Sequence, residues 1–228
     1  MRCILSVLTK DRNARLWLVL RHGEKAPWDL HNSFEETTLS ERGMKDSFEF
    51  GVILKEAGLT LSQLGSSPLP RCIQTCDNIA KSYGLDITVH SDNILAYPGS
   101  LSPQDSQENI SLENTIQEKT ISGNNAQRAN RCPSKGIRNV LGTVLNKPCQ
   151  GHKIGLFVTH DAIIAPILTF LTDEIFDPKT KWIGYLDGFG LCHTEGYWIV
   201  INGHGGIYDV SSQIQLLTDG FGCLQGHP

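Results

Sequence analysis

The sequence has no long hydrophobic run and no marked excess of charge of either sign. No stretch approaches the roughly 18 consecutive apolar residues that a membrane-spanning helix needs. The net charge over 228 residues is −4, so no overall basic field would attract nucleic acid or an anionic membrane. We therefore expect neither as a partner. An anionic ligand would have to meet positive charge that is concentrated locally.

Signatures of metal and nucleotide binding are missing as well. The seven cysteines have no zinc-type spacing, no carboxylate cluster of the kind that holds Mg²⁺ is visible, and there is no Walker-type lysine loop. We therefore expect no cofactor and no metal. The apolar run from Cys3 to Leu8 is shorter than the core of a secretory signal and lacks a small-residue cleavage site. We expect a cytoplasmic protein, with secretion without a visible leader as the alternative.

The overall composition is that of a globular domain. Hydrophobic residues make up 39% of the chain and charged residues 19%, and this length is ample for a buried core. Predicted strands and helices alternate, which indicates an α/β fold, a three-layer sandwich with a central, mostly parallel sheet flanked by helices on both faces. Polar residues dominate at about 92–131. We therefore expect a single domain over 1–228 with an insertion or cap at that place.

Periodicity and turn residues predict the individual elements. Proline at a first helical turn and glycine just past a helix end mark several of the boundaries. Strands are expected at 14–20, 63–66, 85–90 and 153–158, with a hairpin at 185–202. Helices are expected at 40–57, 70–83, 134–145 and 162–171. The glycine-rich residues after 202 carry little pattern.

Both strongly apolar strands end in a turn that carries a histidine. Arg21 and His22 follow the first strand, and His160 and Asp161 follow the second. Ligands of such folds bind beyond the carboxyl ends of the strands. Arg71 lies at the start of a predicted helix and would complete the set. Because guanidinium groups and helix N-termini suit phosphate oxygens, these residues predict a phosphate pocket built without metal.

Four segments, in this order along the chain, resemble one family. Leu20-Arg21-His22-Gly23-Glu24-Lys25-Ala26-Pro27 resembles the RHGxRxP signature of the histidine phosphatase superfamily. The segments Leu-Ser-Glu-Arg-Gly at 39–43 and Ser-Ser-Pro-Leu-Pro-Arg at 66–71 are similar to the two that follow it in that superfamily. Val158-Thr159-His160-Asp161 resembles the HD motif of the acid phosphatase and phytase branch. The chain is much shorter than is typical of that branch.

The resemblance implies a reaction and a role for each residue. His22 would be the nucleophile and would carry the phosphoryl group as a phosphohistidine. Arg21, Arg71 and His160 would hold the phosphoryl oxygens, and Asp161 would be the general acid. The implied enzyme is an acid-phosphatase-like phosphomonoester hydrolase. Its substrate would be a small-molecule phosphomonoester or a phosphoprotein.

Two neighbours of the nucleophile are expected at the substrate. Lys25 stands where that branch usually has a second arginine, so a bidentate contact to phosphate becomes a point charge. Glu24 is expected to orient the neighbouring cations, and it is the rival of Asp161 for the role of proton donor.

Two further functions stay open. A phosphoglycerate-mutase-like phosphotransferase would need a glutamate donor, for which Glu108 and Glu113 are the candidates. A non-catalytic module of the same fold would bind phospho-ligands without turnover. The oligomeric state has no signal in the sequence.

Overall fold

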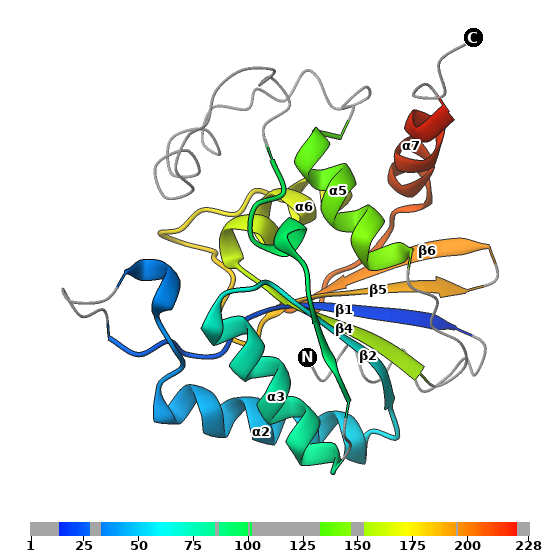
Figure 1. Ribbon diagram of the computed structural model, residues 1–228. Coiled ribbons are helices and arrows are strands. Elements are labelled where there is room, and N and C mark those ends of the chain that lie inside the picture. Colours follow the sequence, from blue (N-terminus) through cyan, green and yellow to red (C-terminus); the bar gives the residue numbers. More distant parts are fainter. Residues whose placement is uncertain are drawn as a thin grey trace, which may run out of the picture.

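The computed structural model describes residues 14–27, 33–84, 87–99, 101, 133–146, 153–194 and 196–222. Within them a seven-stranded sheet runs in the order β3-β2-β4-β1-β5-β6-β7 (Figure 1). The strands are β1 (Arg15–Arg21), β2 (Thr60–Ser66), β3 (Val89–Ser91), β4 (Lys153–Thr159), β5 (Gly188–Thr194), β6 (Tyr197–Asn202) and β7 (Ile207–Asp209). The helices are α2 (Glu41–Glu56), α3 (Pro70–Tyr83), α5 (Lys135–Leu145), α6 (Asp161–Thr172) and α7 (Ser211–Gly222), with 3-10 turns η1 (Phe34–Glu36) and η2 (Asn93–Leu95).

The sheet is mixed. Strands β3, β2, β4 and β1 pair in parallel, whereas β5, β6 and β7 continue the sheet in antiparallel pairings. The predicted α/β sandwich is confirmed, and the parallel part of its sheet is limited to the first four strands. Those four strands include β1 and β4, which are followed directly by His22 and His160.

Two apolar layers cover the two faces of the sheet. Successive side chains of a strand point to opposite faces, so Leu16, Leu18 and Leu20 of β1 pack with α2 and α3. Trp17 and Val19 pack on the other face with α5, α6 and α7. Figure 1 shows α2 and α3 on one side of the sheet and α5 and α6 on the other. Burial on both faces explains why β1 is apolar at every position from Leu16 to Leu20 rather than at alternate positions.

Capping residues set the helix ends where the sequence predicts them. The Ser40 hydroxyl accepts from the Gly43 N–H at the start of α2, and Ser134 caps α5 in the same way. Gly84 takes the left-handed conformation, with φ of 66°, and ends α3. Strand β7 and helix α7 were not predicted. None of the helices within the ranges given above is long and apolar enough to cross a membrane.

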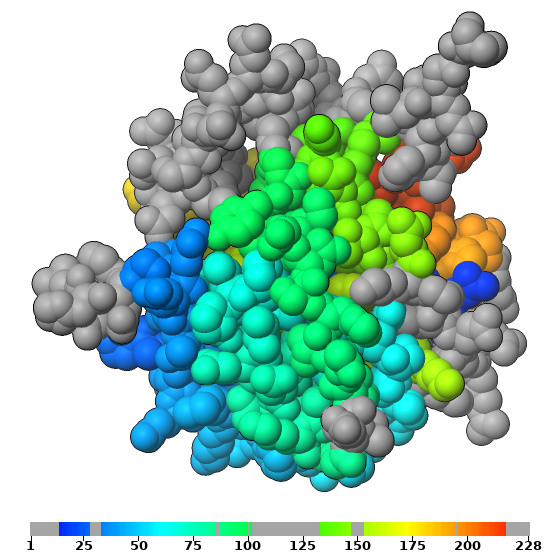
Figure 2. Space-filling view, in the orientation of Figure 1, coloured from blue at the N-terminus to red at the C-terminus, as the bar shows by residue number. Residues whose placement is uncertain are grey.

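Only the start of the polar stretch at 92–131 is described. It contains η2, and its Leu95 is fully buried in the layer formed with α5 and α6. In the space-filling view the segment 87–99 lies alongside α5 on the same face of the molecule (Figure 2). Residues 100 and 102–132, with Glu108 and Glu113, lie outside the described residues. The insertion therefore stays a prediction.

Candidate active site

Two neighbouring strand ends bring His22 and His160 together. Strands β1 and β4 are parallel, and Arg21 pairs with Thr159 at their carboxyl ends. The next backbone N–H, that of His22, donates to the Thr159 carbonyl at 3.1 Å. The centroids of the two imidazole rings lie 5.4 Å apart in an edge-on arrangement.

The hydrogen bonds of His22 fix its tautomer. Nδ1 lies 2.7 Å from the carbonyl oxygen of Gly23, and because a carbonyl only accepts, Nδ1 carries the proton. Nε2 therefore holds the free electron pair. Burial lowers the pKa of His22 to about 4, and the charges of Arg71 and Arg21 act in the same direction. The ring is neutral near pH 7 and could act as a nucleophile through Nε2.

Arg71 approaches that free nitrogen from the start of α3. Its Nε donates to Nε2 of His22 at 3.2 Å, and its Nη1 donates to the Phe34 carbonyl at 2.9 Å. The side chain is 1% exposed. The Phe34 ring lies 4.5 Å from the guanidinium carbon of Arg71 and 4.3 Å from Nζ of Lys25. Phe34 thus holds two cations beside the nucleophile without neutralising either.

His160 occupies the N-cap of α6 and is 7% exposed. Its Nε2 lies 2.9 Å from the Ser67 hydroxyl and 3.7 Å from the Cys72 sulfur. Burial, with His22 and Arg71 nearby, holds the pKa of His160 well below its ordinary value. A neutral ring beside a helix N-terminus is suited to donating a hydrogen bond to a phosphoryl oxygen.

Asp161 is an acceptor in its described contacts. Its Oδ2 accepts from the Trp182 indole N–H at 2.8 Å and pairs with Nη2 of Arg21 at 3.0 Å. Its Oδ1 accepts from the Ala162 N–H at 2.9 Å. The carboxylate therefore ties the end of β1 to the start of α6 and to the segment that carries Trp182.

That segment, between α6 and β5, is the part of the site that sequence reasoning missed. Besides Trp182, it supplies the Ile183 carbonyl, which accepts from Nη1 of Arg21 at 2.6 Å. It also supplies Tyr185, whose ring lies 4.3 Å from the guanidinium carbon of Arg21 and 5.9 Å from the ring of His22. The predicted hairpin starts at Tyr185, whereas β5 begins at Gly188. The signal that could have revealed this segment is its pair of aromatic residues after the helix.

Glu174 anchors the same segment to the antiparallel part of the sheet. Its Oε2 accepts from Nζ of Lys181 and from Nδ2 of Asn202, both at 2.9 Å. Its Oε1 accepts from the hydroxyl of Tyr208 in β7. The position of Trp182 beside Asp161 thus depends on contacts with β6 and β7.

Glu24 points to helix α2 in its described contacts. Its Oε1 accepts from the Ser40 hydroxyl at 2.8 Å, and its backbone carbonyl accepts from the Ser40 N–H at 2.9 Å. A Cβ at Gly43 would lie 2.1 Å from the Glu24 carbonyl, and one at Gly23 would lie 2.9 Å from the Gly43 carbonyl. Helix α2 therefore packs flush against the loop after His22, and only glycine fits on both sides of the contact.

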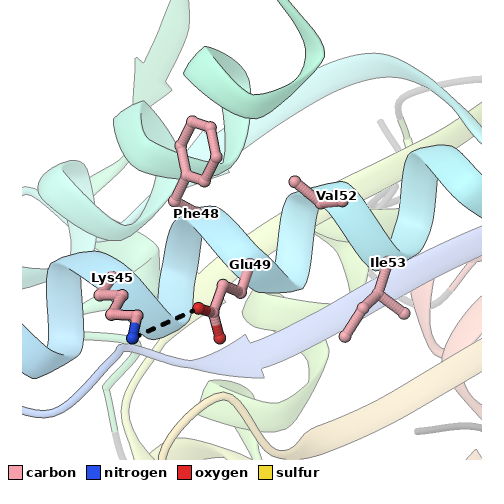
Figure 3. Close-up of a pocket in the computed structure, with 5 residues that line it drawn as sticks. All are labelled: Lys45, Phe48, Glu49, Val52 and Ile53. Carbon is pink, nitrogen blue, oxygen red and sulfur yellow. Dashed lines mark ion pairs between the residues drawn. The ribbon is translucent and has the colours of Figure 1, made fainter.

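A separate hollow of about 550 Å³ opens on the surface of α2 (Figure 3). Five residues of that one helix line it, and Lys45 pairs with Glu49 at 3.7 Å. The lining residues are Lys45, Phe48, Glu49, Val52 and Ile53. None of them belongs to the histidine cluster, so this hollow is not the candidate site. Within the described parts of the chain, no group of three or more His, Cys, Asp or Glu side chains could hold a metal ion.

Part of the chain matches a known family. Residues 16–96 match the model of the histidine phosphatase superfamily, branch 1. The superfamily is therefore supported. The matched stretch contains Arg21, His22 and Arg71, and it ends before His160 and Asp161. The particular closeness to the acid phosphatase and phytase branch is not confirmed.

Individual proteins resemble the chain in sequence over a short stretch or in fold. A phosphoglycerate mutase of Candida albicans is 41% identical over 66 residues, which are 28% of this chain and 26% of the mutase. The match therefore spans about a quarter of that relative. The solved phosphoglycerate mutase from Bacillus anthracis str. Sterne has a TM-score of 0.55 at 17% identity, over 91% of this chain and 98% of that one. A mycobacterial glucosyl-3-phosphoglycerate phosphatase has a TM-score of 0.54 at 18% identity, over 85% and 100%. Both structures share the fold.

Proposed function

We propose that this protein hydrolyses phosphomonoesters through a phosphohistidine formed on His22. The state of its ring carries the proposal. The proton on Nδ1 is directed to the Gly23 carbonyl, which leaves the electron pair on Nε2 beside Arg71. A neutral imidazole of fixed tautomer is a competent nucleophile.

The surrounding cations would stabilise the transferred group. Phosphoryl transfer spreads negative charge over three equatorial oxygens, so preorganised donors supply much of the catalysis. We assign this role to Arg21, Arg71 and His160, with Lys25 as an additional point charge. Because burial lowers the pKa of both His22 and His160, their rings are uncharged near pH 7, and the arginines are the main source of positive charge.

In the first step Nε2 of His22 forms a bond to phosphorus as the bond to the ester oxygen breaks. In the second step water attacks the phosphohistidine, and inorganic phosphate and free His22 are produced. We assign the proton transfers to Asp161, which would protonate the leaving oxygen and then accept a proton from the water. Arg21 now pairs with Asp161. We expect it to turn toward the phosphoryl group when substrate binds, which would free an Asp161 oxygen for this task.

The adjacent His160 and Asp161 support an acid-phosphatase-like reaction. The names of the relatives support a small phosphorylated molecule as substrate, because they act on phosphoglycerate or a glucosyl derivative of it. A phosphoprotein is the other candidate substrate.

A phosphoglycerate-mutase-like phosphotransferase is the second candidate function. It is favoured by the sequence match to the Candida albicans mutase. A mutase would depend on a bisphosphorylated primer and would return the phosphoryl group to its substrate. A hydrolase needs no primer and releases inorganic phosphate.

The deciding experiment measures release of inorganic phosphate from phenyl phosphate, with a chelator present, for the wild type and for His22→Ala. We expect chelator-resistant turnover that falls by about a thousandfold or more in the variant. Acid-quenched protein from labelled substrate should carry an acid-labile phosphoryl group in the wild type alone. Thermal melting verifies that the variant is folded. Turnover that survives in folded His22→Ala would exclude His22 as the nucleophile.

A further inference from the structure

Three partly exposed aromatic side chains lie on or next to the cationic residues of the candidate site. Phe34 is 39% exposed, Tyr185 41% and Tyr97 47%. Single exposed aromatic residues are common and need no explanation. These three, however, all contact residues of the candidate active site or of the turn beside it. Phe34 packs on Arg71, Tyr185 packs on Arg21, and the Tyr97 hydroxyl donates to Glu35, the neighbour of Phe34.

Two of the rings pack on different arginines of the site. Tyr185 comes from the segment after α6 and lies 5.9 Å from the ring of His22, on the side of Arg21. Phe34 comes from η1 and lies on the side of Arg71, whose Nε contacts Nε2 of His22 at 3.2 Å. A phosphoryl group on Nε2 would therefore lie beside two arginines, each of which carries a partly exposed aromatic ring.

The 3-10 turn that carries Phe34 is fixed in place. Ser33 and Glu36 cap it reciprocally, each accepting from the backbone N–H of the other. The neighbouring Glu35 accepts from the Tyr97 hydroxyl at 2.6 Å. This contact joins the turn to the segment after η2. The turn that carries Phe34 is therefore preorganised, which lowers the conformational entropy that is lost when a ligand binds against it.

The contacts of Asp161 bear on which leaving group suits the site. Both of its oxygens accept hydrogen bonds, from Arg21, Trp182 and Ala162. Even after Arg21 turns to phosphate, two N–H donors remain on this carboxylate. A leaving group that needs little protonation suits such a site. A phenol, with a pKa of about 10 as in tyrosine, leaves far more readily than an alkyl alcohol.

We propose that the site is specific for the phosphate monoester of a phenol, whose ring packs against the exposed aromatic side chains of Tyr185 and Phe34. This inference rests on the proposed phosphohistidine reaction. The bond from Nε2 to phosphorus forms as the bond from phosphorus to the phenolic oxygen breaks. The phenolate takes its proton from Asp161 or from water. Water then cleaves the phosphohistidine to phosphate and free His22.

Phosphonates have no leaving group, so their binding tests the contact with the aromatic side chains alone. Benzylphosphonate and methylphosphonate both offer the anion, but only the former offers a ring. We expect benzylphosphonate to inhibit about tenfold more strongly, as packing against two aromatic side chains would allow. In Tyr185→Ala this ratio should fall to about threefold or less. Methylphosphonate inhibition of the same variant reports separately on Arg21, on which Tyr185 packs, so the ratio isolates the contribution of the ring. Tyr197→Ala, at a 58% exposed tyrosine of β6, is the matched control and should keep the full ratio.

Substrates then identify the source of the phenol. Phenyl phosphate and a phosphotyrosyl peptide should both exceed glycerol 2-phosphate in kcat/KM. The faster of the two tells whether the phenol belongs to a small molecule or to a protein. Equal inhibition by the two phosphonates in a wild type that still forms phosphohistidine would overturn the aromatic specificity and leave the hydrolase intact. Failure to form phosphohistidine from any of the three esters would overturn the proposed function itself.

Discussion

Nε of Arg71 donates to Nε2 of His22 across 3.2 Å, so the guanidinium holds the very nitrogen proposed to attack phosphorus. This contact orients the ring, and it must be given up when the bond between nitrogen and phosphorus forms. The second contact of Arg71, from Nη1 to the Phe34 carbonyl, does not involve the nucleophile and could persist. The guanidinium could thus pass from the electron pair to a phosphoryl oxygen with a small movement.

We predict that Arg71→Lys lowers kcat/KM by about a hundredfold, because the loss of one preorganised donor to a developing anion typically costs that much. Lysine keeps the charge but cannot make the two directed contacts. Arg42→Lys, at an exposed ion pair on α2 with Asp46, is the control and should leave kcat/KM unchanged. Steady-state kinetics on folded proteins decides the matter. A loss of less than threefold in Arg71→Lys would contradict the role of the directed contacts.

The ring of His22 should stay neutral well below pH 6. Burial lowers its pKa from 6.5 to about 4, and nitrogen-detected NMR of the ring should show a proton on Nδ1 alone down to about pH 4. The unfolded chain binds more protons than the folded chain between these two values. Stability should therefore fall as the pH drops from about 6.5 toward 4. His160 acts in the same direction. Titration of His22 near pH 6.5 would contradict the burial argument.

Much of the local geometry could be predicted from the sequence because it depends on local patterns. Continuous apolar runs revealed β1 and β4 as buried strands, and Pro70 with Gly84 marked the ends of α3. The segment with Trp182 and Tyr185 has no such pattern. Its place is determined by contacts of Glu174 with residues more than 25 positions away, in β6 and β7. Side-chain contacts at that sequence separation have no signature in one sequence.

Close packing at Gly43 gives a prediction about stability. A Cβ there would lie 2.1 Å from the Glu24 carbonyl oxygen, and backbone cannot yield as a flexible side chain can. Gly43→Ala should lower the free energy of unfolding by about 1–3 kcal/mol and should impair turnover, because the displaced loop carries His22. Gly184→Ala is the matched control, since its Cβ would meet nothing closer than 3.8 Å. Denaturant unfolding of both variants makes the comparison, and equal stability would refute the packing argument.

Trp182 should act on the reaction through Asp161. Trp182→Phe keeps the ring but removes the N–H that donates to Oδ2 at 2.8 Å. We predict a fall in kcat of about tenfold, typical for losing a hydrogen bond to a charged group, with little change in KM. In an Asp161→Asn background the same substitution should have a much smaller effect. Trp198→Phe, at a tryptophan stacked on Trp17 in the sheet, is the control. Equal effects in both backgrounds would show that Trp182 does not work through Asp161.

Asp161→Asn should affect alkyl esters more than aryl esters. A general acid contributes about 10²–10⁴ to a rate when the leaving oxygen is basic, and it contributes little when the leaving group is a phenol. We therefore predict that Asp161→Asn lowers kcat for glycerol 2-phosphate by about a hundredfold or more and lowers kcat for phenyl phosphate by less than tenfold. Asparagine keeps the volume, and its amide oxygen can still accept from Trp182. Measuring both substrates on one preparation separates this effect from a general disturbance of the pocket. Equal losses on the two esters would mean that Asp161 holds Arg21 and does not carry the proton.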